Sequence, residues 1–346
     1  MSPRGTERGQ GWRSALRILR VLVTGGLLAV VCLKTDLSQL ADTLAHARPG
    51  DLLLGVGLAG AARYLGACQM QRVMGMVGVA FNIWQVIVIN LSAAFYEIVL
   101  PAAQLSGGMV RLHRFSQPKR QGTQALAAIL FNRFMDTLTL VVLGLVFWAF
   151  GHAGGSQGAV IGSTLAILLA ALLAFHVEVK HGKLSSAAAH WPLLQVCWRA
   201  VPQGLRSTVQ RLLGQIARSY RRFRLAHAAM LPIGILSLIR HLLFIASLGY
   251  FARAIGLEVP WPVFGWMRTV VVLLMMLPIS VGGFGLREGS LVVLLAPFGV
   301  AASGAVSLSL VMFASAVFFG ALGGLVELAH ALEAGRKPRQ VRPAVS

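Results

Sequence analysis

Acidic residues are scarce in this chain of 346 residues, which carries 11 Asp and Glu against 31 Lys and Arg and has a formal net charge of +20 at pH 7. Charged residues make up 12% of the sequence, about half the share found in soluble domains. Apolar residues make up 56%, the mean hydropathy is +0.73, and long apolar runs recur from end to end. Because these apolar runs recur along the whole sequence, a soluble protein with one apolar segment is excluded. We predict an all-α polytopic membrane protein, because backbone groups in lipid must be satisfied within helices.

Several motifs that carry chemistry are missing as well. The three cysteines are scattered (Cys32, Cys68 and Cys197), which argues against a disulfide framework or a zinc site. No P-loop GxxxxGK[ST] and no histidine–carboxylate constellation is visible, so neither direct ATP use nor enzymatic catalysis is expected. We therefore predict no catalytic residue, no metal site and no cofactor. The basic residues lie between the apolar runs, as the positive-inside rule expects, so no nucleic-acid partner is predicted.

The apolar runs predict about six full spans within a single membrane domain covering residues 1–346. They lie near 14–33, 51–71, 122–150, 158–176, 228–250 and 301–330. Ala45-His-Ala47 is a formal signal-peptidase site, but it lies far beyond the first run, so an uncleaved first helix is expected. Two further segments, 82–110 and 262–298, are interrupted by proline and glycine.

Basic connections orient these spans. Residues 1–13, 177–226 and 335–346 are rich in arginine and are expected in the cytoplasm, so both termini are cytoplasmic. With this orientation, 82–110 enters and leaves from the inside and 262–298 from the outside, which makes both segments re-entrant. Residues 177–226 also show helical spacing of apolar positions between arginines. That segment either lies on the anionic inner leaflet or serves as ordinary positive-inside anchoring.

The two interrupted segments resemble each other. "VLPAAQLSGGMVR" (99–111) and "MLPISVGGFGLR" (276–287) both place Leu-Pro at the end of an apolar run, followed by a glycine pair and an arginine. Broken helices in corresponding positions that enter from opposite sides indicate an inverted repeat with a binding site at its centre. The candidate substrate-binding residues are Pro101, Gly107, Gly108, Arg111, Pro278, Ser280, Gly282, Gly283, Gly285, Arg287 and Glu288.

The second motif has a physical rationale. Pro278 ends one half-helix, and the glycines allow tight backbone before a new helix begins near 285. That helix start would offer free N–H groups to an anion, with Arg287 as its counter-charge. The alternative is that Arg287 and Glu288 pair internally and only fasten the turn.

Other charges within apolar segments need partners. Arg133 and Asp136 lie on one helix face and are interpreted as a structural ion pair. Glu97 and Glu327 are candidate proton-relay groups. Arg240, His241 and Arg268 complete the set, with Arg268 expected to extend toward the membrane surface.

These motifs carry a family resemblance that covers nearly the whole chain. "LPISVGGFGLREGSLVVLL" resembles the C-terminal signature of the flippase-like family that includes the transmembrane domain of lysylphosphatidylglycerol synthase. "NLSAAFYEIVLPAAQLSGGMVRLHRF" and "ALAAILFNRFMDTLTLVVLGL" are similar to its earlier signatures, in the same order. Met109 and Asn132 stand where the family often has acidic residues, which puts headgroup selectivity in doubt.

The resemblance implies a fold with re-entrant elements that moves or houses a lipid. We expect a lipid transporter of the bacterial inner membrane, passive or ion-coupled, for an anionic-headgroup or hopanoid-type lipid. No aminoacyl-transfer domain is visible, so lysyl-lipid synthesis is not expected. Two alternatives remain open: a non-transporting partner subunit of a lipid-synthesis enzyme, and a lipid-headgroup transferase.

Overall fold

A computed structural model describes residues 45–99, 103–117, 122–151, 156–180, 227–276 and 285–336. Within these ranges the chain forms helices joined by short turns and contains no strand, so the all-α prediction is confirmed. The elements are α3 (Pro49–Met76), α4 (Ile83–Val99), α5 (Ala103–Ser116), α6 (Gly122–Gly151), α7 (Ser156–Lys180), α11 (His227–Ala254), α12 (Trp261–Met275), α13 (Leu286–Leu295), the 3₁₀ turn η2 (Ala296–Phe298) and α14 (Ala302–Arg336).

Five of the described helices are long and apolar enough to cross a membrane: α3, α6, α7, α11 and α14. They coincide with the predicted spans 51–71, 122–150, 158–176, 228–250 and 301–330, and extend them by a few residues. The predicted span 14–33 and the basic N-terminus lie outside the described residues. So do residues 181–226 of the basic segment 177–226 and residues 337–346 of the tail.

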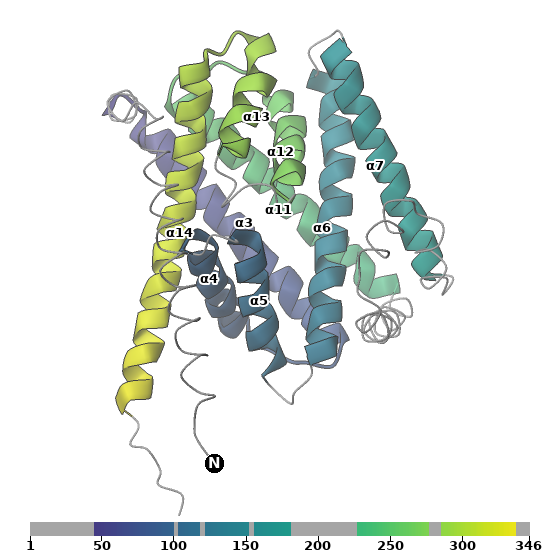
Figure 1. The fold of residues 1–346 in the computed structure, drawn as a ribbon, viewed down its shortest axis with the longest axis vertical. Coiled ribbons are helices and arrows are strands. Elements are labelled where there is room, and N and C mark those ends of the chain that lie inside the picture. The colour runs from purple at the N-terminus through teal and green to yellow at the C-terminus, as the bar shows by residue number, and fades with distance from the viewer. Residues whose placement is uncertain are drawn as a thin grey trace, which may run out of the picture.

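Each interrupted segment folds as a pair of short helices. The first pair is α4 and α5, which pack against each other, and the second is α12 and α13. The first pair is longer than predicted, because α5 continues to Ser116. Figure 1 shows the two pairs in opposite halves of the molecule, with α4 and α5 below and α12 and α13 above. This placement agrees with segments that approach from opposite sides.

The order of elements repeats along the chain, and the packing is reciprocal. A long helix, a short pair and a second long helix form the run α3, α4–α5, α6, and the same order returns as α11, α12–α13, α14. The long helix α14 of the second run packs on α4 of the first, and α6 of the first packs on α12 of the second. The leading helices α3 and α11 pack against each other. If a two-fold axis relates the two runs, α4 corresponds to α12 and α6 corresponds to α14. The contact of α14 with α4 then requires the contact of α6 with α12, and both are present.

Small residues allow these helices to approach closely. On α14, a Cβ atom added at Gly323 would collide with the backbone carbonyl of Leu91 in α4. On α6, Gly144 lies against Thr269 of α12, whose hydroxyl donates to the Leu140 carbonyl oxygen at 3.1 Å and so also bonds the two helices. Larger side chains at either glycine would separate a short pair from the helix that supports it.

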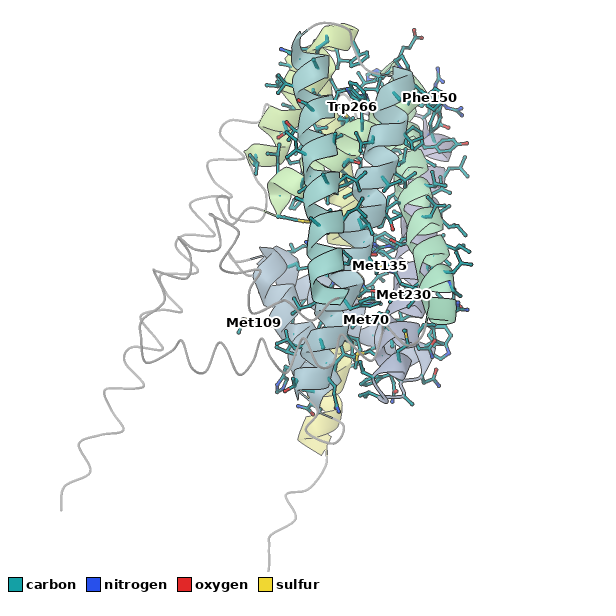
Figure 2. All side chains as sticks on the ribbon, turned by 90° about the vertical axis from the view of Figure 1, so that its right-hand side faces the viewer. Met70, Met109, Met135, Phe150, Met230 and Trp266 are labelled. Carbon is teal, nitrogen blue, oxygen red and sulfur yellow. The ribbon has the colours of Figure 1, made fainter. Side chains whose placement is uncertain are left out.

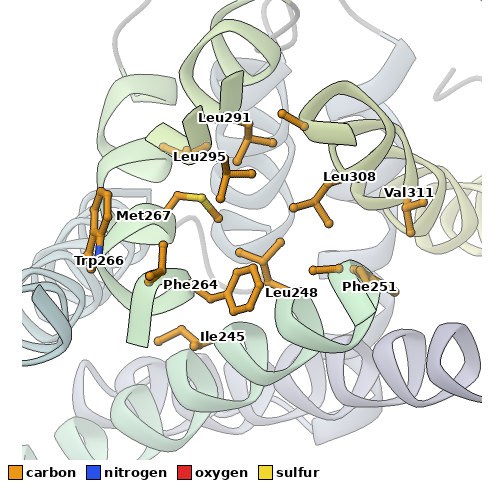
Figure 3. Packing of buried hydrophobic residues seen from close by; sticks show 14 of the residues in the cluster. Ile245, Leu248, Phe251, Phe264, Trp266, Met267, Leu291, Leu295, Leu308 and Val311 are labelled. Carbon is orange, nitrogen blue, oxygen red and sulfur yellow. The ribbon is translucent and has the colours of Figure 1, made fainter. Parts of the chain in front are cut away.

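The buried apolar side chains form two clusters, one in each half. The upper cluster joins α11, α12, α13 and α14 and includes Leu291, Leu295 and Leu308 (Figure 3). The lower cluster surrounds Met70, with Met135 and Met230 packed against it, in the lower part of Figure 2. Large apolar residues also point outward, among them Phe150 with 79% of its surface exposed. A protein that meets lipid tails tolerates such exposure on its outer faces.

Candidate functional site

The second motif enters the described structure at Gly285. This residue has φ 78°, in the left-handed region that favours glycine, and α13 begins directly after it at Leu286. The predicted restart of a helix near 285 is therefore confirmed. The turn residues Pro278, Ser280, Gly282 and Gly283, and Pro101 in the first motif, lie outside the described residues.

Arg287 and Glu288 form a closed cluster with Ser309 of α14. The Arg287 guanidinium donates from Nη2 to Glu288 Oε1 at 2.7 Å and from Nε to Ser309 Oγ at 2.6 Å. The Ser309 hydroxyl in turn donates to Glu288 Oε1 at 2.7 Å. Only 6% of Arg287 is exposed, and its guanidinium lies 5.5 Å from the centre of the Phe313 ring. The charge of Arg287 is thus met inside the protein.

Glu288 also takes the position that the sequence assigns to an anion. Its Oε2 accepts the Gly285 N–H at 2.7 Å, so this N–H at the start of α13 is already bonded. The expectation of free N–H groups is wrong at this position, because the glutamate three residues ahead folds back over the helix end. The internal pairing of Arg287 with Glu288 is thus present in the structure, at the start of α13.

The first motif contains a comparable pair. Arg111 on α5 donates from Nη1 to Glu97 Oε1 on α4 at 3.0 Å and from Nε to Asn90 Oδ1 at 3.1 Å. Both motifs therefore place an ion pair at the arginine that follows the glycines. The glutamate comes from the preceding helix in the first motif and from the next residue in the second. Glu97, a candidate proton-relay group, is held by this arginine.

Gly107 provides the space for Glu97. A Cβ atom at Gly107 would overlap the Glu97 carboxylate, whereas nothing lies within 4 Å of a Cβ atom added at the neighbouring Gly108. We expect Gly107→Ala to lower the free energy of unfolding by about 1–3 kcal/mol, because the carboxylate must move away from Arg111. Gly108→Ala, on the same helix, should change it much less. Thermal unfolding of both variants in detergent measures the difference, and equal melting temperatures would contradict the packing described.

Asp136 on α6 joins three helices. Its carboxylate accepts hydrogen bonds from Gln69 on α3 at 2.8 Å and from Ser237 on α11 at 3.0 Å, and its salt bridge to Arg240 on α11 is 2.5 Å long. Asn132, one turn before it, donates to its second oxygen at 3.2 Å. The structural role predicted for Asp136 is supported, and its ion-pair partner Arg240 comes from another helix. Arg133, the partner interpreted from the sequence, lies within the electrostatic influence of Asp136 as well.

Glu327 is bound at the lower end of α14. Arg114 on α5 donates from Nη2 to Glu327 Oε1 at 2.5 Å and from Nη1 to the Ser92 hydroxyl on α4 at 3.2 Å. This pair connects the first short helix pair to α14. Glu327 therefore acts as a structural anchor in this state, whatever part it plays in proton movement.

Two arginines behave differently from what the sequence suggests. Arg268 lies over the Phe244 ring of α11, 4.5 Å from its centre, with Nε buried, and does not simply extend toward a membrane surface. Arg63 on α3 was not among the predicted residues, yet it lies over Phe319 of α14 at 4.6 Å with a buried Nε. A signal for Arg63 exists in the sequence: it precedes Pro101 by 38 positions, as Arg240 precedes Pro278.

Comparison with known families bears directly on these motifs. The family model for the lysylphosphatidylglycerol synthase TM region matches residues 17–324 of the chain. The match covers both interrupted segments and all five candidate spans up to residue 324, and it confirms the resemblance found in the motifs. No curated protein matches the chain. Together with the apolar helices, the family match identifies a multi-pass membrane protein with a lipid-related role.

Proposed function

The chain belongs to the lysylphosphatidylglycerol synthase transmembrane-region family, and we propose that it transports a lipid between the leaflets of the bacterial inner membrane. The observation that carries this proposal is the reciprocal packing of the two helix runs, with a short pair in each half of the molecule. Transporters built from inverted repeats bind their substrate where broken helices of the two repeats meet. The family match, which indicates a lipid-related role, supports a lipid as the substrate class in this proposal.

In this proposal the two short pairs are re-entrant and open to opposite sides. The headgroup of an anionic or hopanoid-type lipid enters between them, with the start of α13 at one side of its path. Arg287 and Glu288 attach the start of α13 to α14 through Ser309. Transport is passive or ion-coupled, and the candidate carboxylates for proton exchange are Glu97 and Glu327, each of which is bound to an arginine in the structure.

The orientation of the chain in the membrane follows, in this proposal, from the distribution of its basic residues. Both termini and the basic segment 177–226 lie on the cytoplasmic side, where the segment contacts the anionic leaflet. The protein has no catalytic activity of its own in this proposal. A lipid-synthesis enzyme that produces the transported lipid is the partner expected.

Leaflet exchange of labelled lipids in proteoliposomes that contain only the purified protein tests the proposal. We expect exchange well above that of empty liposomes, and a loss of about tenfold or more when Arg287 and Glu288 are both replaced by glutamine. The double replacement avoids an unpaired buried charge and still removes the salt bridge that fastens the turn. The matched control replaces Asp51 and Arg253, an ion pair that joins α3 to α11, by asparagine and glutamine.

The outcomes are separable. Exchange that is equal in both double variants would place the path away from the 282–288 motif. No exchange of any phospholipid or polycyclic lipid, with unchanged lipid mass, would favour the partner-subunit function. A change in lipid mass would show a transferase.

A further inference from the structure

Two arginines lie where the two helix runs cross. Arg63 on α3 and Arg240 on α11 stand at the same distance in sequence from the prolines of their motifs, and α3 packs on α11. The Arg240 side chain lies against α3 at Gly66, three residues after Arg63, where an added Cβ atom would be 3.2 Å from Arg240 Cδ. If the runs are related by a two-fold axis, these are equivalent residues, and the axis passes between them.

A third arginine reaches the same place from the upper short pair. Arg268 on α12 lies over Phe244, which follows Arg240 by one turn of α11. The charges of Arg240 and Arg63 both act on Arg268. Arg63, in turn, is within electrostatic reach of Glu97 and Arg111 in the lower pair. The electrostatic contacts of these arginines therefore extend from Arg268 in the upper short pair, through Arg240 and Arg63 on the crossing helices, to the lower pair.

Positive charge at this centre exceeds negative charge. Asp136 is bound by Arg240, and Glu97 is bound by Arg111. Among the described residues, no carboxylate lies within salt-bridge distance of Arg63 or Arg268, and the Nε atoms of all three central arginines are buried without a hydrogen-bond partner. Aromatic rings offset part of this charge through cation–π contact. Like charges in a medium of low dielectric constant repel strongly, so the arrangement calls for an anion.

We propose that Arg63, Arg240 and Arg268 form a binding centre for a phosphate-type oxyanion, borne by a phospholipid headgroup or free in solution. Guanidinium groups bind phosphate oxygens through pairs of N–H donors, and here Arg63 on α3 and Arg240 on α11 both lie within electrostatic reach of Arg268 on α12. This inference rests on the proposed function for the lipid as the source of the phosphate. It differs from the turn at Arg287, whose charge Glu288 already meets.

Titration calorimetry on the full chain in an uncharged detergent tests the centre. The probes are dihexanoyl phosphatidylglycerol, inorganic phosphate, and dihexanoyl glycerol, which has the same tails and no phosphate. Wild-type protein should bind the phospholipid saturably and the glycerol lipid not at all. Arg63→Gln and Arg268→Gln should each weaken binding about tenfold or more, since a hydrogen bond to a charged group is lost. The control Arg72→Gln, at an exposed position on α3, should bind as wild type.

Thermal unfolding without added ligand separates an anion site from structural support. Because removal of one guanidinium relieves repulsion, the two glutamine variants should melt no lower than wild type. Lower melting, with phosphate binding retained, would overturn the proposal and leave the arginines as partners of Phe244 and Phe319. Phe244→Leu provides a second check, since it removes the aromatic ring and keeps Arg268. This variant should still bind dihexanoyl phosphatidylglycerol.

The sources of phosphate and the two proposals can be told apart. Binding of inorganic phosphate but not of phosphatidylglycerol, with the same dependence on Arg63 and Arg268, would support the centre with free phosphate as its ligand. Binding of neither probe by wild type would overturn it. Binding without leaflet exchange would reject the transport function and support the anion centre. Exchange that does not change when Arg63 or Arg268 is replaced would support the transport function and reject the centre.

Discussion

Asp136→Ala is expected to lower the free energy of unfolding by about 3–5 kcal/mol, because it leaves the Arg240 guanidinium buried without its carboxylate. The loss also removes the acceptor of Gln69 and Ser237, and thereby separates α3, α6 and α11. If Arg63 and Arg268 form an anion centre with Arg240, removal of Asp136 also increases the excess of positive charge there. Unfolding in detergent, followed by tryptophan fluorescence, measures the effect.

Asp51→Ala is the matched control for this prediction. Asp51 also pairs with an arginine of α11, Arg253, at 2.7 Å. The Arg253 side chain is 54% exposed, however, so it can turn to solvent when its partner is removed. We expect a clearly smaller loss of stability. Equal losses in the two variants would show that Asp136 does not carry the connection between the three helices.

Gly323→Ala is expected to have the second large effect. The added methyl group would meet the Leu91 carbonyl of α4, and a backbone atom in a helix moves only if the whole helix moves. We expect the free energy of unfolding to fall by about 1–3 kcal/mol, at the upper end of this range, because α14 is pushed away from the first short pair. The comparison is Gly57→Ala on α3, where nothing lies within 4 Å of the new atom.

A variant that keeps α4 and α14 together should retain its melting temperature, so thermal unfolding decides the matter. Gly57→Ala is expected to match or slightly exceed wild type, because alanine favours a helix over glycine. If Gly323→Ala unfolds at the same temperature as Gly57→Ala, the close approach of α14 to Leu91 is not the contact that holds the first pair.

The sequence allows the helices to be predicted but not their partners. Apolar length gives the five described spans within a few residues, and Leu-Pro with the glycines gives both interruptions. These are local properties of the chain. The salt bridges between Asp136 and Arg240 and between Arg114 and Glu327 join residues that are 104 and 213 positions apart, so they depend on which helices pack together.

The candidate site illustrates the same limit at single residues. Arg287 is conspicuous in the sequence because it stands in a glycine-rich interruption, yet its charge is met by the residue beside it. Arg63 is inconspicuous because one arginine in a long apolar run reads as a tolerated charge. It becomes notable only when its distance to Pro101 is compared with that of Arg240 to Pro278. That comparison requires a reason to align the two runs, and the reciprocal packing provides it.

The exchange of partners between the two runs has a mechanical consequence. Since α14 supports α4 while α6 supports α12, neither short pair can shift without pushing a helix of the opposite run. If one run tilted against the other about the crossing of α3 and α11, the packing would loosen at one short pair and tighten at the other. A conformation open at both ends would require both supports to break at once. If the protein transports lipid as proposed, this order of supporting contacts disfavours a path that is open to both sides of the membrane at once.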